Sequence, residues 1–272
     1  LMSFVGSNIL AGASGSQGAA GYKIERSLRF NSGDSASLSR TPSSAGNRKT
    51  WTWSGWVKRS KIAGDNQPFL TANSSTGNSF FMGWHGYYTG GREDAIEINN
   101  IAGVGDGYVT TAVFRDQSAW YHVVVAFDST QSTAGDRIKC FINGVQQTWQ
   151  QTSNGPGLND DWKVNDTIAH TIGGTANSFT GQGKLDSYLA DVHFVDSQAL
   201  APTDFGEYDD NNVWQPKAFT GSHNIAGRDY SGGGSTSGSF HSAGPYTNMF
   251  DGSASTGAFS STGTATFTFG SS

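Results

Sequence analysis

The chain has 272 residues, of which 37 are glycine, 14% are charged and 12% are aromatic. The aromatic content is too high for a disordered chain, while glycine occurs at about twice its usual ~7% frequency. A net charge of −5 without a basic stripe argues against binding to nucleic acid. No apolar run approaches the roughly 20 residues that cross a bilayer, so we expect no membrane insertion. These values indicate an all-β protein with many short strands and glycine turns.

Residues 1–21 form a first segment made mostly of small residues. Only four apolar side chains could anchor it: Phe4, Val5, Ile9 and Leu10. An isolated peptide of this kind buries too little surface to order itself. We therefore expect either a flexible arm or a clip that docks onto a neighbouring protein. The segment also lacks the charged start and continuous apolar stretch of a signal peptide.

Residues 22–219 are predicted to form the main domain, in which alternating segments are separated by turns. In residues 49–59, Trp51, Trp53 and Val57 share one face and Trp56 lies on the other. Lys58, Arg59 and Lys61 form the densest basic cluster, which we interpret as the solvated end of this strand. Further strands are expected at residues 27–30, 35–40, 68–83, 95–101, 108–114, 167–173 and 185–195. About a dozen strands of this kind suit a two-sheet sandwich.

Residues 120–145 contain the strongest local signal. An aromatic and β-branched block is followed by a polar loop, and then Ile138, Cys140 and Ile142 share one face while Arg137 and Lys139 share the other. Asn143-Gly144 supplies the residues that a type I′ hairpin turn prefers. We therefore predict an antiparallel hairpin with one buried face. Cys140, the only cysteine, is predicted to be a small buried side chain, and an internal disulfide framework is excluded.

Three blocks resemble laminin-G-like, concanavalin A-like jelly-roll domains. They are residues 28–58, the Trp-Tyr-His-Val block with its Asn-Gly hairpin at 120–145, and residues 179–200, which contain an acidic residue followed by an Ala-Leu turn. The blocks occur in the order that the family has. This resemblance implies an all-β, two-sheet antiparallel jelly-roll sandwich.

The sequence of residues 22–60 and 189–221 also resembles that of structural proteins of bacteriophages, especially those of marine bacteria and cyanobacteria. The resemblance implies a virion protein on a tail fibre or other appendage, assembled in the host cytoplasm. Folding without disulfides is compatible with that compartment. The partners implied are other virion proteins and host cell-surface glycans, and a homo-oligomer is expected.

The chain changes character after Phe219. Residues 220–247 are rich in glycine and serine and are predicted to be a linker. Residues 248–272 are interpreted as the start of a second, truncated β module. Their last strand-like stretch, 264–269, is not stable alone. It could instead pair with another part of this chain or with another subunit, and whether the native chain continues past Ser272 stays open.

Catalytic patterns are weak. Retaining glucanases of the resembled family carry three carboxylates on one strand, and the nearest match here is Glu93-Asp94 with Glu97. Side chains alternate along a strand, so Asp94 would point away from the two glutamates. The glutamates would stand about 13 Å apart, whereas retaining chemistry needs roughly 5–5.5 Å. His122 and His193 are expected to be packed or hydrogen-bonded within strands. We therefore expect no enzyme.

Calcium enters only through the resemblance, because laminin-G-like domains often bind it at the rim of the sandwich. Asp160, Asp161 and Asp166, with Asn159 and Asn165, offer hard oxygen ligands. The alternative is a solvated polar turn.

Exposed aromatic rings on rim loops stack on sugar faces. Trp84, His85, Tyr87 and Tyr88 lie in a glycine-flanked segment that we read as a loop. We hypothesise that they form or border a carbohydrate site with two further residues, Trp149 and Trp162. The alternative is that these side chains cover the edge of the sandwich.

The function expected from the sequence is a phage virion protein whose lectin-like domain attaches to host surface glycans. Many copies would raise the avidity of weak individual sites. The first alternative is a purely structural capsid decoration or tail-assembly protein that binds no glycan. A glycosidase that degrades polysaccharide is the third possibility.

Overall fold

The computed structural model describes residues 21–62, 64–75, 78–86, 93–102, 104–151, 155–175 and 183–223, together with the backbone of two short strands at 234–237 and 264–269. Helical structure in this part is limited to three short 3-10 turns: η2 (Ser32–Asp34), η3 (Ala134–Asp136) and η4 (Pro202–Asp204). Among the same residues, none forms a helix with the length and apolar character to span a membrane.

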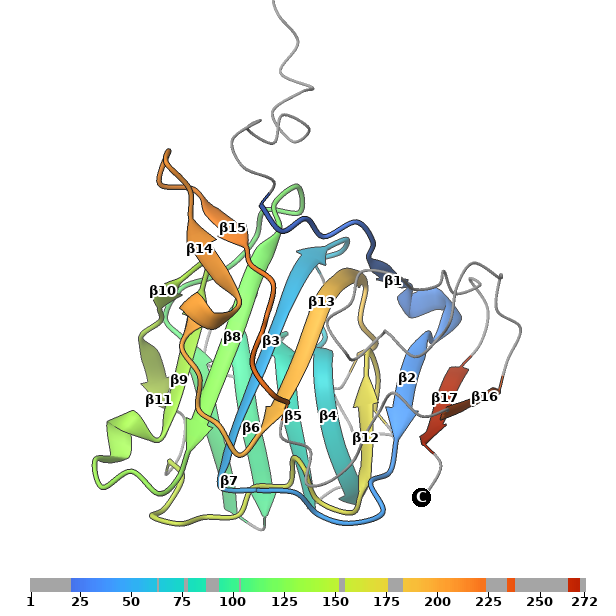
Figure 1. The fold of residues 1–272 in the computed structure, drawn as a ribbon. Helices are drawn as coiled ribbons and strands as arrows, with labels where there is room; N and C mark the ends of the chain where they lie inside the picture. Colours follow the sequence, from blue (N-terminus) through green and yellow to red (C-terminus); the bar gives the residue numbers. More distant parts are fainter. Residues whose placement is uncertain are drawn as a thin grey trace, which may run out of the picture.

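Two large sheets contain most of the strands. The six-stranded sheet has the order β1 (Leu28–Phe30), β13 (Ser187–Asp196), β3 (Thr50–Arg59), β8 (Tyr121–Asp128), β9 (Ile138–Ile142), β10 (Val145–Gln146). The nine-stranded sheet has the order β11 (Trp149–Gln151), β7 (Val104–Thr110), β6 (Ile96–Ala102), β5 (Asn78–Trp84), β4 (Gln67–Ser75), β12 (Ala169–Ile172), β2 (Ser37–Arg40), β17 (Thr264–Phe269), β16 (Gly234–Ser237). A small hairpin, β14 (Gly206–Tyr208) with β15 (Trp214–Pro216), stands beside β10 (Figure 1).

The sheets face each other, with β3, β8 and β13 in front of β4, β5 and β6 in the view of Figure 1. All pairings in the six-stranded sheet are antiparallel, as the register of β13 and β8 on either side of β3 shows. The predicted all-β jelly-roll sandwich is therefore confirmed. The predicted range 68–83 is divided between β4 and β5, which pair antiparallel.

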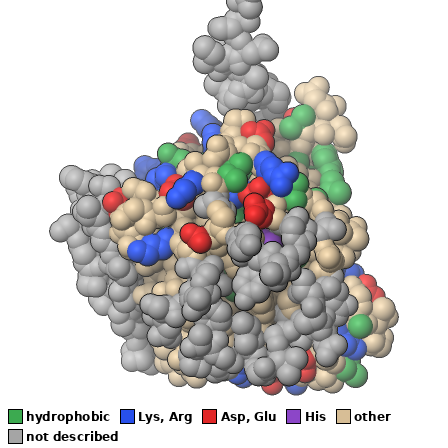
Figure 2. Space-filling view, turned by 180° about the vertical axis from the view of Figure 1, so that it is seen from behind, with side chains coloured by type: hydrophobic (Ala, Val, Ile, Leu, Met, Phe, Trp, Pro, Cys, Tyr) green, Lys and Arg blue, Asp and Glu red, His purple; other side chains and the backbone are tan. Residues whose placement is uncertain are grey.

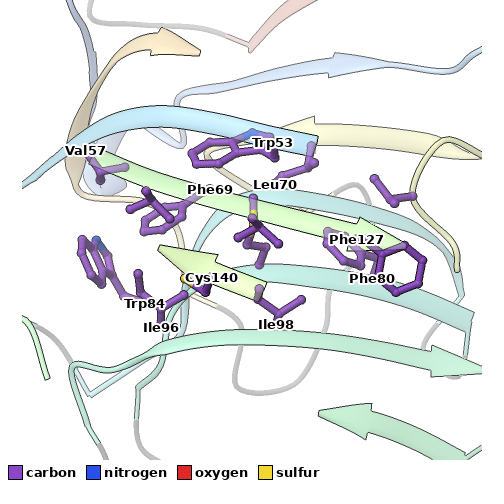
Figure 3. Close-up of a cluster of buried hydrophobic side chains, with 14 of the residues drawn as sticks. Trp53, Val57, Phe69, Leu70, Phe80, Trp84, Ile96, Ile98, Phe127 and Cys140 are labelled. Atoms are coloured by element: carbon purple, nitrogen blue, oxygen red, sulfur yellow. The ribbon is translucent and has the colours of Figure 1, made fainter. Parts of the chain in front are cut away.

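The core between the sheets is aromatic. Trp51 and Trp53 are almost completely buried, and Trp51 stacks on Phe127 with ring centroids 5.1 Å apart. Trp53 stacks on Phe69 of the opposite sheet at 6.0 Å, as Figure 3 illustrates from β3 to β4. Trp56 points to the other side of β3 and packs with Trp214 in a separate cluster. The predicted alternation along this strand is confirmed.

The predicted hairpin is present between β9 and β10, with Val145 opposite Ile142. Asn143 and Gly144 have φ values of 48° and 79°, the left-handed conformation that a type I′ turn requires. Cys140 faces the core from β9 and is fully buried, as expected.

The strand at 264–269 pairs within this chain. Its backbone runs parallel to β2 and antiparallel to β16 at the edge of the nine-stranded sheet. The sequence left open whether this strand pairs with another part of the chain or with another subunit, and the structure has the first arrangement. The arm at 1–20 and most of 220–272 lie outside the described residues, and the predicted division into domains stays a prediction.

Candidate functional site

Two of the tryptophans predicted to border a carbohydrate site lie in the core. Trp84 has no exposed surface and packs edge-on against Phe69, with ring centroids 4.9 Å apart. Trp162 is equally buried and lies 4.4 Å from the ring of Phe127. A ring without an exposed face cannot stack on a sugar, so the expectation of exposed aromatics is wrong for these two residues. Figure 3 shows Trp84 directed between the sheets, toward Phe69 and Ile96.

Trp149 is half-buried and lies near the edge of the sandwich. Its ring meets Tyr108 edge-on at 5.3 Å, and its Nε1 donates to the carbonyl of Ile138 at 3.3 Å. These contacts link β11 of one sheet to β9 of the other, which fits the alternative that the aromatics cover the edge. Tyr87 and Tyr88 lie outside the described residues. Trp84 and Trp162 are therefore excluded from the predicted carbohydrate site. For the other four residues of the set the site remains a prediction.

The loop predicted to bind calcium is organised by an arginine. Arg48 donates from Nε to the carbonyl of Trp162 at 2.7 Å and from Nη2 to that of Asp161 at 3.2 Å. The same Nη2 lies 3.3 Å from the carboxylate of Asp166. Asp160 turns the other way and accepts from the backbone N–H of Gly157. The guanidinium therefore engages the Asp166 carboxylate and two backbone carbonyls of this loop, and Asp160 is engaged by Gly157.

The donor set of this loop does not fit calcium, because a cation already lies among its oxygens. No group of three or more histidine, cysteine, aspartate or glutamate side chains within the described residues could hold a metal ion.

His85 does belong to a polar site, which we call the His85 cluster: Asn66, His85, Glu97 and Asn99. Side chains alternate along β6, and Ile96 and Ile98 are buried in the core. Glu97 and Asn99 therefore lie on the outer face of the strand. The Oε2 of Glu97 accepts from His85 Nδ1 at 3.0 Å and from Asn66 Nδ2 at 3.1 Å. Its Oε1 accepts from Asn99 Nδ2 at 3.3 Å. One carboxylate thus orders three neighbouring side chains.

The cluster keeps an unused acceptor. The Oδ1 of Asn99 is buried and has no hydrogen-bond partner among the described residues, and the same holds for Asn73 Oδ1 and Thr171 Oγ1 on the same sheet face. The side chains of His85 and Glu97 retain about a tenth of their exposure, 10% and 12%. The outer face of the nine-stranded sheet therefore carries buried hydrogen-bonding atoms that have no partner in the part of the chain that the structure describes.

A second group adjoins this cluster, and we call it the Asp94 ion network: Arg59, Asp94 and Arg115. Asp94 Oδ1 accepts from Arg59 Nη1 at 2.9 Å, and Oδ2 accepts from Arg115 Nε at 2.8 Å. The Arg59 side chain has no exposure and that of Asp94 has 4%, whereas that of Arg115 has 61%. Burial lowers the pKa of Arg59, and the Asp94 charge opposes that shift.

The position of Arg59 corrects the interpretation of the basic cluster as a solvated strand end. Arg59 follows Val57 by two residues on β3 and therefore faces the interior, where its guanidinium lies 4.8 Å from the Trp84 ring centroid. The alternation that places Trp51 and Trp53 inward also places Arg59 there. This signal was present in the sequence.

The carboxylates that the sequence suggested for glycosidase chemistry have separate tasks. Glu93 is exposed and precedes β6, Asp94 is held between two arginines, and Glu97 orders the His85 cluster. Asp94 lies in the turn before β6 with a φ of 72°, so its direction toward the two arginines does not follow from the strand alternation that the sequence predicted. Asn66 and Asn99 were missed by the sequence reasoning. Alternation around Ile96 and Ile98 could have indicated Asn99, but nothing local marks Asn66.

A serine–histidine pair lies on the opposite side of the sandwich. Ser54 Oγ is 2.9 Å from His122 Nε2, and Trp214 Nε1 donates to His122 Nδ1 at 2.9 Å. Because Nδ1 accepts from the indole, Nε2 carries the hydrogen and donates to the serine. Burial lowers the pKa of His122 to about 3. The tautomer is thus the opposite of the one that activates a serine nucleophile.

Both strand histidines are packed and hydrogen-bonded, as predicted. His193 Nε2 donates to Asp191 at 3.1 Å, and its ring stacks with that of His223.

A comparison with family models agrees with this architecture. A family model described as the concanavalin A-like lectin/glucanases superfamily matches residues 30–204. The laminin alpha1 chain of the mouse, domains LG4-5, is 10% identical with a TM-score of 0.46, and the match covers 66% of this chain and 44% of that one. A heptameric SAP-like pentraxin from Limulus polyphemus is also 10% identical, with a TM-score of 0.41 and coverage of 66% and 75%.

Domain 4 of AbnA, an extracellular arabinanase from Geobacillus stearothermophilus solved with arabinotriose, is 13% identical with a TM-score of 0.38 and coverage of 58% and 65%. This chain spans less than half of the laminin structure that it matches. No curated protein matches the sequence. The family match extends over more than half of the chain and ends just before the β14–β15 hairpin. The chain belongs to the concanavalin A-like lectin/glucanases superfamily.

Proposed function

We propose that this protein is a lectin-like module that binds saccharides through the His85 cluster on the outer face of the nine-stranded sheet. The observation that carries the proposal is the Glu97 carboxylate, whose side chain keeps 12% of its exposure and which orders Asn66, His85 and Asn99 around it. The family to which the chain belongs includes lectins and glucanases by its description.

The chemistry of the cluster suits sugar hydroxyls. A hydroxyl both donates and accepts, so it pairs well with a carboxylate and an amide that stand side by side. Hydrogen bonds to a charged group are worth about 1.5–3 kcal/mol, more than neutral ones. Glu97 and Asn99 are joined by one hydrogen bond of 3.3 Å, which keeps their orientation fixed before a ligand arrives.

The proposal is for binding without hydrolysis. A general acid and a second carboxylate must both address one glycosidic bond. Here Asp94 is occupied by Arg59 and Arg115, and Glu97 accepts three hydrogen bonds from neighbouring side chains. With Asp94 held in ion pairs by two arginines, Glu97 has no second carboxylate to act with it on one glycosidic bond.

The wider role that we propose is adhesion by a bacteriophage virion, with the module on a tail fibre or other appendage. The support for this role is the resemblance of residues 22–60 and 189–221 to phage structural proteins. Several copies in a homo-oligomer would convert weak single sites into firm attachment to host glycans. Imaging of an intact particle separates this role from a purely structural one, because an adhesin projects from an appendage whereas a decoration protein lies on the capsid lattice.

A glycan array with the module displayed in many copies tests the binding site. We expect Glu97→Gln to weaken binding at least about tenfold, because the charge-assisted hydrogen bond to the sugar is lost. Glu207→Gln is the matched control, since Glu207 is exposed on β14, well away from the cluster in sequence and sheet. A reducing-end assay on the bound glycans should detect no product.

Two results would contradict the proposal. One is an array on which the wild-type protein binds no glycan. The other is equal binding by the Glu97 and Glu207 variants, after circular dichroism has established that both are folded.

A further inference from the structure

We propose that Arg115 recognises an acidic group on the ligand, so that the saccharide bound at the His85 cluster carries a carboxylate. This inference rests on the proposed function and names its ligand class. The Asp94 ion network supplies the evidence, because backbone hydrogen bonds join Asp94 to His85 and the network holds one exposed guanidinium.

The charge balance of the network leaves one positive charge at the surface. Arg59 and Arg115 contribute two positive charges and Asp94 one negative charge. Arg59 and Asp94 have side-chain exposures of 0% and 4% and compensate each other in the interior. The surplus charge therefore lies on Arg115, whose side chain is 61% exposed.

The geometry leaves the recognising edge of Arg115 available. The guanidinium is tied to Asp94 Oδ2 through Nε, at 2.8 Å. This bond uses one side of the planar group, and its two terminal nitrogens have no partner among the described residues. Those nitrogens form the edge that binds a carboxylate through two parallel hydrogen bonds.

Backbone hydrogen bonds join the network to the His85 cluster. Asp94 donates its N–H to the carbonyl of His85 at 2.9 Å, and His85 donates to Ala95 at 2.8 Å. Phe114, the residue before Arg115, donates to the carbonyl of Asp94 at 2.8 Å. The segments around His85, Asp94 and Phe114 thus lie side by side. Arg115 follows Phe114 directly, so its side chain begins one residue from these backbone bonds.

Asp94 adopts a strained backbone to serve this arrangement. Its φ of 72° lies in the left-handed region, which residues other than glycine adopt uncommonly. Neutralising the buried Arg59 accounts for Asp94 Oδ1, but it does not account for the second oxygen, which is directed to an exposed arginine. Orientation of Arg115 accounts for the second oxygen.

The charges on the surrounding surface favour recognition of a ligand carboxylate by one positioned arginine over attraction by a broad positive potential. Figure 2 shows positive and negative side chains interspersed over the upper part of this side of the molecule. Glu97 already accepts three hydrogen bonds. A ligand carboxylate therefore gains most by meeting Arg115, while ligand hydroxyls meet Glu97 and Asn99.

The test compares ligands that differ only in charge. Oligogalacturonate and sialyllactose are each measured against their own methyl esters by titration calorimetry with the full chain. We expect the wild type to bind an acidic probe at least about tenfold more tightly than its neutral partner, with the preference falling as salt rises. Arg115→Gln should remove that preference, and Arg115→Lys should retain part of it.

Arg29→Gln is the matched control, because Arg29 also forms an ion pair with an aspartate, Asp186, but on the other sheet. It should leave the preference unchanged. Arg115→Gln should remain folded, since Asp94 keeps its bond to Arg59, and thermal unfolding checks this.

Each outcome has a defined meaning. If neutral probes or neutral array glycans bind as well as acidic ones, or if Arg115→Gln behaves like Arg29→Gln, the inference fails while the proposed function stands. If the wild type binds no saccharide at all, both fail.

Discussion

Two histidines are held in their neutral forms by the hydrogen bonds that surround them. Trp214 donates to Nδ1 of His122, and the backbone N–H of Asn165 donates to Nε2 of His170 at 2.8 Å. A second proton on either ring would direct one N–H against another. Burial is the main reason that the pKa falls to about 3 for His122 and about 4 for His170.

Acid should therefore destabilise the fold through these residues. A histidine in the unfolded chain has a pKa of about 6.5, so below that pH the unfolded state binds more protons than the folded state. The free energy of unfolding therefore decreases as the pH is lowered below about 6.5, by up to about 1.4 kcal/mol per pH unit for each histidine. The decrease continues to about pH 4 for His170 and to about pH 3 for His122.

Urea unfolding between about pH 7 and about pH 4.5 measures this slope. We expect the slope to be smaller in His122→Asn and in His170→Asn than in the wild type, whatever the absolute stability of each variant. Parallel profiles for the wild type and both variants would show that other groups govern the acid sensitivity.

At the scale of elements, the β9–β10 hairpin depends on the left-handed turn at Asn143-Gly144. The turn also packs against β15, because the Gly144 backbone lies directly beside the Trp214 ring. The Oδ1 of Asn143 accepts from the N–H of His122 at 2.8 Å, and its carbonyl accepts from Tyr208. One turn thus connects the six-stranded sheet to the small hairpin.

Gly144→Ala should destabilise the protein by at least about 1–2 kcal/mol, the cost of a left-handed residue with a Cβ. The added Cβ would also lie 2.5 Å from Trp214 Cζ3. Gly135→Ala is the control, since a Cβ at Gly135 meets nothing within 4 Å. Thermal and urea unfolding of the two variants measure the difference. Equal stabilities would mean that the turn relaxes without cost.

At the scale of the whole molecule, the two sheets enclose one continuous core, which includes the only cysteine. Cys140 has no exposed surface, and burial raises the pKa of its thiol. The thiolate is the reactive form. Reaction at this position therefore requires the sheets to separate.

Labelling with a disulfide reagent should report that separation. We expect Cys140 to resist labelling in the native protein and to react fully in concentrated guanidinium chloride. The rate in intermediate urea should follow the equilibrium between folded and unfolded protein. Ser118→Cys in a Cys140→Ser background is the control, because Ser118 is exposed and should react at once. Rapid labelling of native Cys140 would show that the sandwich opens locally.

The sequence by itself determined the class of fold and its local geometry. Alternation along 49–59 assigned Trp51, Trp53 and Val57 to one face, and Asn143-Gly144 specified the hairpin turn. These properties depend on the twofold repeat of a strand and on the φ values that a turn requires, and both act between near neighbours.

Only the tertiary structure decided which side of each strand meets the other sheet and which distant residues meet. Aromatic residues lie on both faces of this sandwich, so composition could not tell that Trp84 and Trp162 fill the core. The His85 cluster joins Asn66 to β6, and the Asp94 ion network joins residue 59 to residue 115. Such contacts depend on how the sheets pack and on where the loops return, which no pattern between near neighbours encodes.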